Sequence, residues 1–182
     1  YAELVVGQTK EVQFSFDTKH GTDDYLEVIG GKTASLIRTS AKLGAMASNS
    51  SPGLIESISS WAWHSGIIFQ ITDDILDLNS DTETLGKPAG NDILEGTYTL
   101  PVLLALEKDR IKIEDILHQV KNSEIELVEV LREFNNDEIV EESNKFVNHH
   151  FKQSNEAIKN IEDKKISNIL NNINEYLLQR SN

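Results

Sequence analysis

The stretch PGLIESISSWAWHSGIIFQITDDILDL, residues 52–78, decides how this chain folds. Its apolar side chains recur around most of a helix rather than along one stripe, which is typical of a helix buried in the middle of a bundle. Ser51 can cap the start of that helix, and Pro52 suits its first position, where a backbone N–H would have no partner. The pattern therefore predicts one central helix over residues 52–78.

The rest of the chain repeats the three-to-four residue spacing of helices, and the alternation typical of strands is nearly absent. We therefore predict an all-α fold in which residues 1–182 form a single domain. Thr22 is the expected N-cap of the second helix. Gly30 and Gly31 each destabilise that helix by about 1 kcal/mol relative to Ala. We therefore expect a kink or a close approach there. The helices predicted outside the central one cover residues 2–16, 23–47, 99–108, 113–120, 123–134, 136–161 and 167–179, with a loop over 79–97.

The composition excludes several classes of protein. The chain carries 30 Asp and Glu against 17 Lys and Arg, and this net charge of −13 argues against nucleic acid, because phosphate binding needs clustered cations. No cysteine is present, which excludes disulfides and thiolate metal sites and fits a cytoplasmic protein. No apolar run reaches the roughly 18–20 residues of a membrane-spanning helix, so we predict no transmembrane segment.

Three aspartates gather at the end of the central helix. At about 100° per residue, Asp77 lies about 40° and Gln70 about 60° from Asp73, so these three share a face, and Asp74 lies at its margin. Carboxylates this close repel unless a cation offsets them. Their oxygen ligands suit Mg²⁺ or Mn²⁺, and Mg²⁺ commonly combines one or two carboxylates with substrate phosphates. The cluster therefore predicts a metal-bridged diphosphate, although a solvated helix end stays open as an alternative for the cluster taken alone.

The residues around this cluster add the groups that such a site needs. The loop sequence GKPAGND, residues 86–92, supplies a turn, the cation of Lys87 and the carboxylate of Asp92. Lys32 and Thr33, in the sequence GGKTASL, can provide further neutralisation of a diphosphate.

Three motifs in this order resemble those of the trans-prenyl (polyprenyl) diphosphate synthases. FQITDDILD with the following LGKPAGNDILEGTYTLPVLLAL is similar to the second aspartate-rich motif, GGKTASLIRTSAKLGA to the Lys-Thr helix, and VVGQTKE to the Gly-Gln helix. The resemblance implies a helical bundle of the isoprenoid synthase type around a deep apolar cavity. It also implies a prenyltransferase that condenses isopentenyl diphosphate with an allylic diphosphate through an allylic carbocation assisted by Mg²⁺ or Mn²⁺.

The resemblance further implies roles for individual residues. Asp73 matches a direct metal ligand, and Asp74 and Asp77 match residues that act on the metal through water or neighbouring groups. The residues implied to act in catalysis are Lys32, Thr33, Gln70 and Lys87. The residues implied to contact substrate are Gln8, Lys32, Thr33, Phe69, Gln70 and Lys87.

Two departures from the family pattern matter. The sequence GTYTLP places Thr97 where many short-chain members have a lysine, which resembles bacterial medium- and long-chain enzymes such as the catalytic subunit of heptaprenyl diphosphate synthases. The family's first aspartate-rich motif belongs upstream of VVGQ and is not in these 182 residues. We therefore expect the chain to be the C-terminal portion of such an enzyme and to be inactive alone.

Two alternatives share the same fold. A non-catalytic regulatory or partner subunit would usually lose the aspartates that this chain keeps. A terpene cyclase relative would carry an Asn-Ser-Glu type of metal motif in place of the second aspartate-rich motif, and none is found there. The resemblance also implies a homodimer, or a heterodimer with a small subunit.

The histidines are expected to be structural. His149 and His150 are adjacent and point about 100° apart on a polar helix, which does not favour a metal site. His64, on the central helix, is expected to be a core or interface histidine.

Overall fold

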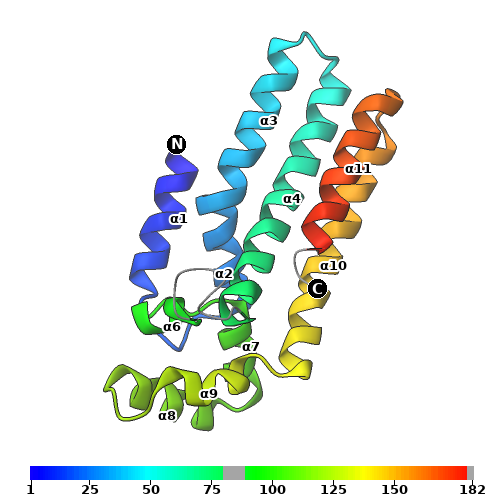
Figure 1. Ribbon diagram of the computed structural model, residues 1–182. Helices are drawn as coiled ribbons and strands as arrows, with labels where there is room; N and C mark the ends of the chain where they lie inside the picture. The colour runs from blue at the N-terminus through cyan, green and yellow to red at the C-terminus, as the bar shows by residue number, and fades with distance from the viewer. Residues whose placement is uncertain (80–88, 180–182) are drawn as a thin grey trace.

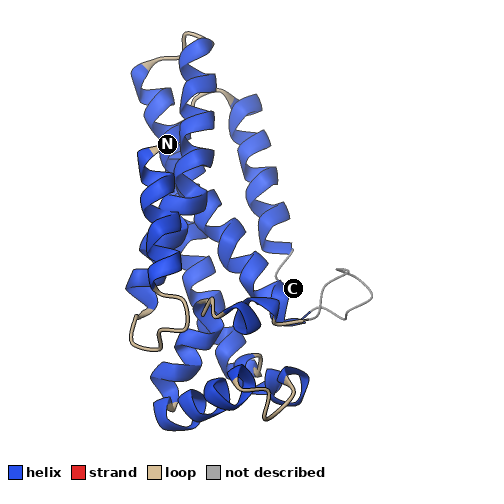
Figure 2. Cartoon of the chain, turned by 90° about the vertical axis from the view of Figure 1, so that its left-hand side faces the viewer, coloured by secondary structure: helices blue, strands red, loops and turns tan. Residues whose placement is uncertain are grey.

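The computed structural model describes residues 1–79 and 89–179, and every regular element in this part of the chain is a helix (Figures 1 and 2). The all-α prediction is therefore confirmed. The helices are α1 (Ala2–Gln13), α2 (Thr22–Ile29), the π-helical turn η1 (Gly30–Ala34), α3 (Ser35–Ala47), α4 (Pro52–Asn79), α6 (Asn91–Glu95), α7 (Leu100–Lys108), α8 (Arg110–Lys121), α9 (Leu127–Phe134), α10 (Asp137–Lys159) and α11 (Lys164–Gln179).

Helix α4 is the centre of the bundle, as the sequence predicts. It packs against α3 on one side and α10 on the other (Figure 1). Ile67, Ile68 and Ile71 are at most 2% exposed, and their core continues into Leu100 and Leu103 of α7. Since α4 is apolar on most of its surface, it needs neighbours on several sides, and the surrounding helices provide them.

The start of α4 also follows the prediction. The backbone N–H of Leu54 donates to the Ser51 hydroxyl at 3.3 Å, and Pro52 is the first helical residue.

The predicted helix over residues 23–47 is interrupted by η1, where α1 crosses it at close range. A Cβ on Gly31 would lie 2.8 Å from the carbonyl oxygen of Glu3, and one on Gly7 would lie 2.4 Å from the backbone nitrogen of Lys32. Only glycine permits this backbone-to-backbone contact. The expected close approach at Gly30 and Gly31 is therefore confirmed.

Two features near the first helix differ from the predictions. Helix α1 ends at Gln13 rather than at Phe16, because Phe16 takes a left-handed φ of 58°. The N-cap of α2 is Gly21 rather than Thr22, and the Asp24 carboxylate accepts from the Gly21 N–H at 3.0 Å.

Side-chain caps move the starts of two later helices. Helix α8 begins three residues earlier than predicted, because the Asp109 carboxylate accepts from the Lys112 N–H at 3.2 Å. Helix α11 also begins earlier, because Asp163 accepts from the backbone of Lys165 at 2.8 Å. By contrast, α9 begins four residues later than predicted, after Ser123 with its φ of 58°.

The loop predicted over residues 79–97 contains the short helix α6 in its described part. Gly90 and Gly96 flank this helix with φ of 72° and 80°, a region that favours glycine. Figure 1 shows α6 at the lower end of the bundle, near α2 and the end of α4.

The last two helices pack along α4 through a buried polar cluster. Asn174 of α11 is fully buried, and its side-chain oxygen accepts from Trp61 at 2.9 Å and from Ser65 and Ser154 at 3.0 Å each. These bonds fix how α10 and α11 align with α4, because a shift of one turn would leave buried groups unpaired. None of the described helices combines the length and apolarity that crossing a bilayer requires.

Candidate active site

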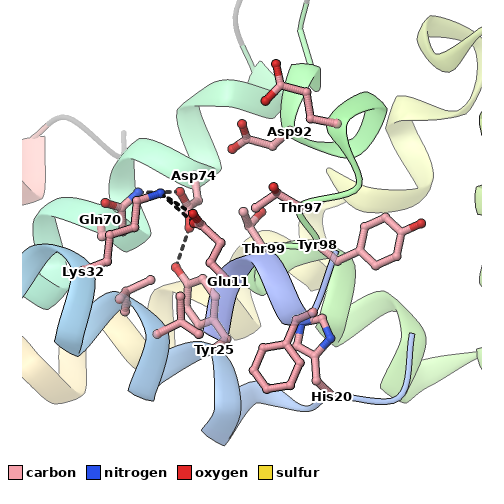
Figure 3. Close-up of a pocket in the computed structure, with 14 residues that line it drawn as sticks. Glu11, His20, Tyr25, Lys32, Gln70, Asp74, Asp92, Thr97, Tyr98 and Thr99 are labelled. Atoms are coloured by element: carbon pink, nitrogen blue, oxygen red, sulfur yellow. Dashed lines mark hydrogen bonds and ion pairs between the residues drawn. The ribbon is translucent and has the colours of Figure 1, made fainter. Parts of the chain in front are cut away.

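A cavity of about 170 Å³ lies at the end of the bundle where α1, α2, η1 and α4 meet the segment from α6 to α7 (Figure 3). Its wall is largely polar on the side of α4 and aromatic on the opposite side. The lining residues are Glu11, Phe14, His20, Tyr25, Val28, Ile29, Lys32, Gln70, Asp74, Asp92, Glu95, Thr97, Tyr98 and Thr99.

Asp74 is the most buried carboxylate of this wall, at 4% exposed. The Tyr25 hydroxyl donates to one of its oxygens at 2.6 Å, and the Gln70 amide donates to the other at 2.8 Å. Burial raises the pKa of Asp74 to about 7; the two hydrogen bonds oppose this rise, and the charges of Asp92 and Asp73 add to it. Two hydrogen bonds thus hold the Asp74 carboxylate in place, while burial disfavours its ionised form.

The other carboxylates lie around the same end of α4. Asp73 is exposed, and Asp77 and Asp92 are half-buried. The pKa of Asp92 is raised to about 6, first by burial and then by the charges of Asp77 and Glu95, while Lys32 opposes the rise. The aspartates of α4 and α6 therefore share one electrostatic environment, with Asp92 above Asp74 in Figure 3.

Lys32 brings the positive charge to this wall. Its ammonium nitrogen lies 2.6 Å and 2.8 Å from the two carboxylate oxygens of Glu11. Among the described residues that line the cavity, Lys32 is the one lysine or arginine, and it is already paired. Negative charge is therefore in excess at the site.

Two glycines explain how η1 reaches these partners. Gly7 admits η1 against α1, and Glu11 lies one turn further along the same face of α1. Gly66 admits η1 against α4, where a Cβ would lie 2.7 Å from Cα of Ala34, and Gln70 lies one turn further along. This spacing brings Lys32 to Glu11, and it brings the Thr33 hydroxyl within 2.8 Å of the Gln70 side-chain oxygen.

The donor set fits a hard divalent ion that also binds phosphate. Within residues 1–79 and 89–179, no three His, Asp or Glu side chains are arranged to hold a metal by themselves. The carboxylates nevertheless offer only oxygen ligands, and the pKa values of Asp74 and Asp92 are raised by burial and, to a smaller extent, by the neighbouring carboxylates. Mg²⁺ keeps several waters and typically binds one or two carboxylates together with phosphate oxygens, so an acidic wall of this kind suits it.

The structure gathers only some of the predicted site residues. Lys32, Gln70 and Asp74 line the cavity, and Thr33 joins them through Gln70. Thr97, which stands in place of a family lysine, lines it too.

Two further residues lie outside the cavity lining and a third is not among the described residues, so the roles of all three stay predictions. Gln8 is exposed on α1 and donates to Glu11 at 2.7 Å. Phe69 packs against the main core rather than lining the cavity. Lys87 lies outside the described residues.

Sequence reasoning missed several cavity residues. Glu11 could have been found from its position one turn after Gly7, whereas Tyr25 carries no signal that separates it from a core tyrosine. His20 stacks on Phe14, with ring centroids 4.7 Å apart, and its buried Nδ1 has no partner in the described part of the chain. Its place between two helices gave no indication of this burial.

Comparisons with known proteins agree with the family that the motifs resemble. The family model described as polyprenyl synthetase matches residues 1–134. The chain belongs to the polyprenyl synthetase family. It is 33% identical over 141 residues to heptaprenyl diphosphate synthase component 2 of Bacillus subtilis, a match that covers 78% of this chain and 40% of that protein.

Other family members match over nearly the whole chain. The short chain isoprenyl diphosphate synthase of Methanothermobacter thermautotrophicus is 33% identical over 182 residues, covering 98% of this chain and 55% of that protein. The crystal structure of heptaprenyl diphosphate synthase from Staphylococcus aureus superposes with a TM-score of 0.89 at 27% identity, covering 100% of this chain and 57% of that one. The chain thus spans about half the length of these relatives.

Proposed function

We propose that this chain forms the metal- and diphosphate-binding half of a trans-prenyltransferase that joins isopentenyl diphosphate to an allylic diphosphate. The observation that supports this most directly is the acidic end of α4. There the pKa values of Asp74 and Asp92 are raised first by burial and then by neighbouring charges, those of Asp92 and Asp73 on Asp74 and those of Asp77 and Glu95 on Asp92. Acidic groups around Lys32 have the ligand atoms and the charge to accept a diphosphate bridged by divalent ions.

The proposed reaction exchanges one bond for another. The allylic C–O bond breaks and its electron pair leaves with pyrophosphate. The double bond of isopentenyl diphosphate then forms a new C–C bond to the allylic cation, and a proton is lost from the product. When bound, Mg²⁺ or Mn²⁺ would offset the charge of the leaving pyrophosphate, with Asp73 and Asp77 as its holders in this chain.

The chain's own residues do the remaining work. Lys32 offsets phosphate charge when its ammonium exchanges the Glu11 carboxylate for phosphate oxygens. Gln70, held by Thr33 and bonded to Asp74, presents a fixed polar wall beside the reacting groups. Val28 and Ile29 contribute an apolar wall that excludes water, which protects a carbocation from capture.

We further propose that the chain is the C-terminal portion of the complete enzyme. Support comes from the Staphylococcus aureus structure, of which this chain covers 57%. The upstream portion would supply the first aspartate-rich motif, either in the same polypeptide or from a partner. The relative named component 2 supports an assembly with a second component, so we propose a heterodimer, and a homodimer is the alternative that the motif resemblance implies.

Binding of Mn²⁺ in the presence of inorganic pyrophosphate tests the half-site directly. Electron paramagnetic resonance or calorimetry should detect binding by the 182-residue chain. Asp73→Asn should weaken the affinity by about 10-fold or more, because it removes a metal-holding carboxylate. Asp115→Asn removes the same charge from the exposed face of α8 and should leave the affinity unchanged. No binding by the unaltered chain, or equal loss in both variants, would overturn the proposal.

A turnover assay tests the proposal that the chain is a portion of a larger enzyme. With labelled isopentenyl diphosphate and an allylic primer, the chain alone should give no product. Full activity of the isolated chain would contradict its assignment as a portion, and the mass of the natural protein gives an independent check.

A further inference from the structure

We propose that Tyr25 is a positioning residue that holds the Asp74 carboxylate in the geometry required for metal and diphosphate binding. This inference rests on the proposed function and adds to it a residue outside the aspartate-rich, Lys-Thr and Gly-Gln motifs. Figure 3 shows Tyr25 below Asp74, on the wall opposite Asp92.

The contact joins two helices that are distant in sequence. Tyr25 belongs to α2, is 5% exposed, and donates its hydroxyl to Oδ2 of Asp74 at 2.6 Å. Its own backbone N–H donates to the Gly21 carbonyl at 3.1 Å, which anchors it in the first turn of α2. A hydrogen bond this short to a carboxylate is of the strong, charge-assisted kind.

The other oxygen of Asp74 is held from α4 and η1. Gln70 donates its amide to Oδ1 of Asp74, and Thr33 donates to the oxygen of the same amide. The hydrogen bond from Thr33 determines which end of the Gln70 amide faces Asp74. Each oxygen of Asp74 thus has one donor, and α2, η1 and α4 are joined at a single carboxylate.

The chemistry of the donor explains why a tyrosine suits this place. A lysine or arginine would neutralise Asp74 and remove part of the negative charge that attracts a divalent ion. A neutral hydroxyl orients the carboxylate and leaves its charge in place. The two hydrogen bonds fix the orientation of the Asp74 carboxylate, so its charge stays beside Asp73 and Asp77, to which the proposed function assigns the ion.

The test compares Tyr25→Phe with a matched control, Ser65→Ala. Both variants delete one buried hydroxyl donor, but Ser65 donates to Asn174, away from the cavity. In the presence of inorganic pyrophosphate, Tyr25→Phe should weaken Mn²⁺ binding by about 10-fold, as loss of a group that orients a metal site does. Ser65→Ala should keep the affinity of the unaltered chain. Thermal unfolding of both variants separates this effect from a general loss of stability.

A double-mutant cycle shows whether Tyr25 acts through Asp74. In an Asp74→Asn background, Tyr25→Phe should have no further effect on Mn²⁺ affinity. A full effect in that background would overturn the inference. If Tyr25→Phe does not fold, 3-fluorotyrosine at position 25 keeps the side-chain shape and strengthens the donor, and an unchanged Mn²⁺ affinity would then overturn it.

The two proposals fail in different ways. If the unaltered chain binds no Mn²⁺ with pyrophosphate, the proposed function falls and the role of Tyr25 falls with it. If the unaltered chain binds and Tyr25→Phe binds equally well, only the role of Tyr25 is wrong.

Discussion

Gly7 of α1 and Gly31 of η1 meet backbone to backbone: a Cβ on Gly31 would lie only 3.0 Å from Cα of Gly7. The contact matters for the site because Glu11 follows Gly7 by one turn and Lys32 follows Gly31 directly. Their ion pair therefore depends on how closely α1 approaches η1. A side chain at either glycine would move the two charges apart.

Gly7→Ala should lower the free energy of unfolding by about 1–3 kcal/mol, the usual result of forcing a methyl group into a filled space. The added Cβ would lie 2.4 Å from the backbone nitrogen of Lys32, and a backbone cannot rotate away as a side chain can. Denaturant unfolding measures the change. Gly44→Ala is the matched control, because nothing lies within 4 Å of its Cβ and helix propensity favours Ala by up to about 1 kcal/mol. If Gly7→Ala and Gly44→Ala have the same free energy of unfolding, the close contact between α1 and η1 is contradicted.

Gln70→Leu should lower the free energy of unfolding by about 1–3 kcal/mol, because it leaves the buried Asp74 carboxylate with one donor in place of two. Thr33 would lose its acceptor at the same time. The matched control is Gln119→Leu, which breaks an exposed hydrogen bond to Asp115 at the same four-residue spacing. That change should stay within about 0.5 kcal/mol. If the two substitutions cost the same, Asp74 does not depend on Gln70.

The elements of this fold were predictable because they depend on local patterns. The central position of α4 follows from apolar side chains around its circumference, and its start follows from Ser51 and Pro52. The earlier starts of α8 and α11 depend on the caps from Asp109 and Asp163, which lie before the predicted starts of both helices. The end of α1 depends on the left-handed Phe16, whose conformation the sequence does not indicate.

The site was predictable where a motif contains its residues, as for Lys32 of η1 and for Gln70 and Asp74 of α4. Gln70 and Asp74 are four residues apart on α4, so their hydrogen bond is a consequence of helical spacing. Tyr25 meets Asp74 through tertiary packing, 49 residues away in sequence, and nothing local indicates the contact. The buried Nδ1 of His20 is likewise a product of packing.

Glu11→Gln should increase the affinity for inorganic pyrophosphate in the absence of divalent ions by about 5-fold, the effect of removing one charge about 4 Å from an anion near a protein surface, after screening. Glu11 pairs with the ammonium of Lys32, so under the proposed function it would compete with phosphate for that ammonium and repel the anion directly. Calorimetry in the presence of a chelator measures the affinity. Glu141→Gln removes the same charge from the exposed face of α10 and should change little. An equal gain in both variants would show only an effect of net charge.

His64 and His150 join α4 to α10, with their Nδ1 atoms 2.9 Å apart. Burial, and then the charges of His64 and His149, lower the pKa of His150 to about 4, and burial also lowers the pKa of His64. A folded pKa below the ordinary value of about 6.5 means that the unfolded chain binds more protons between pH 4 and 6.5. Their contribution to stability should therefore be complete above that range and lost as the pH falls through it.

Thermal unfolding of His150→Gln and the unaltered chain, followed from pH 7 to pH 4, isolates this contribution. The difference between the two is needed because the raised pKa values of Asp74 and Asp92 act in the opposite direction, adding stability as the pH falls below 7. His150→Gln should lose less stability than the unaltered chain on acidification. His118→Gln, an exposed histidine on α8, should keep the original dependence. Parallel curves for all three proteins would show that the pair between α4 and α10 does not bind protons differently in the folded and unfolded states.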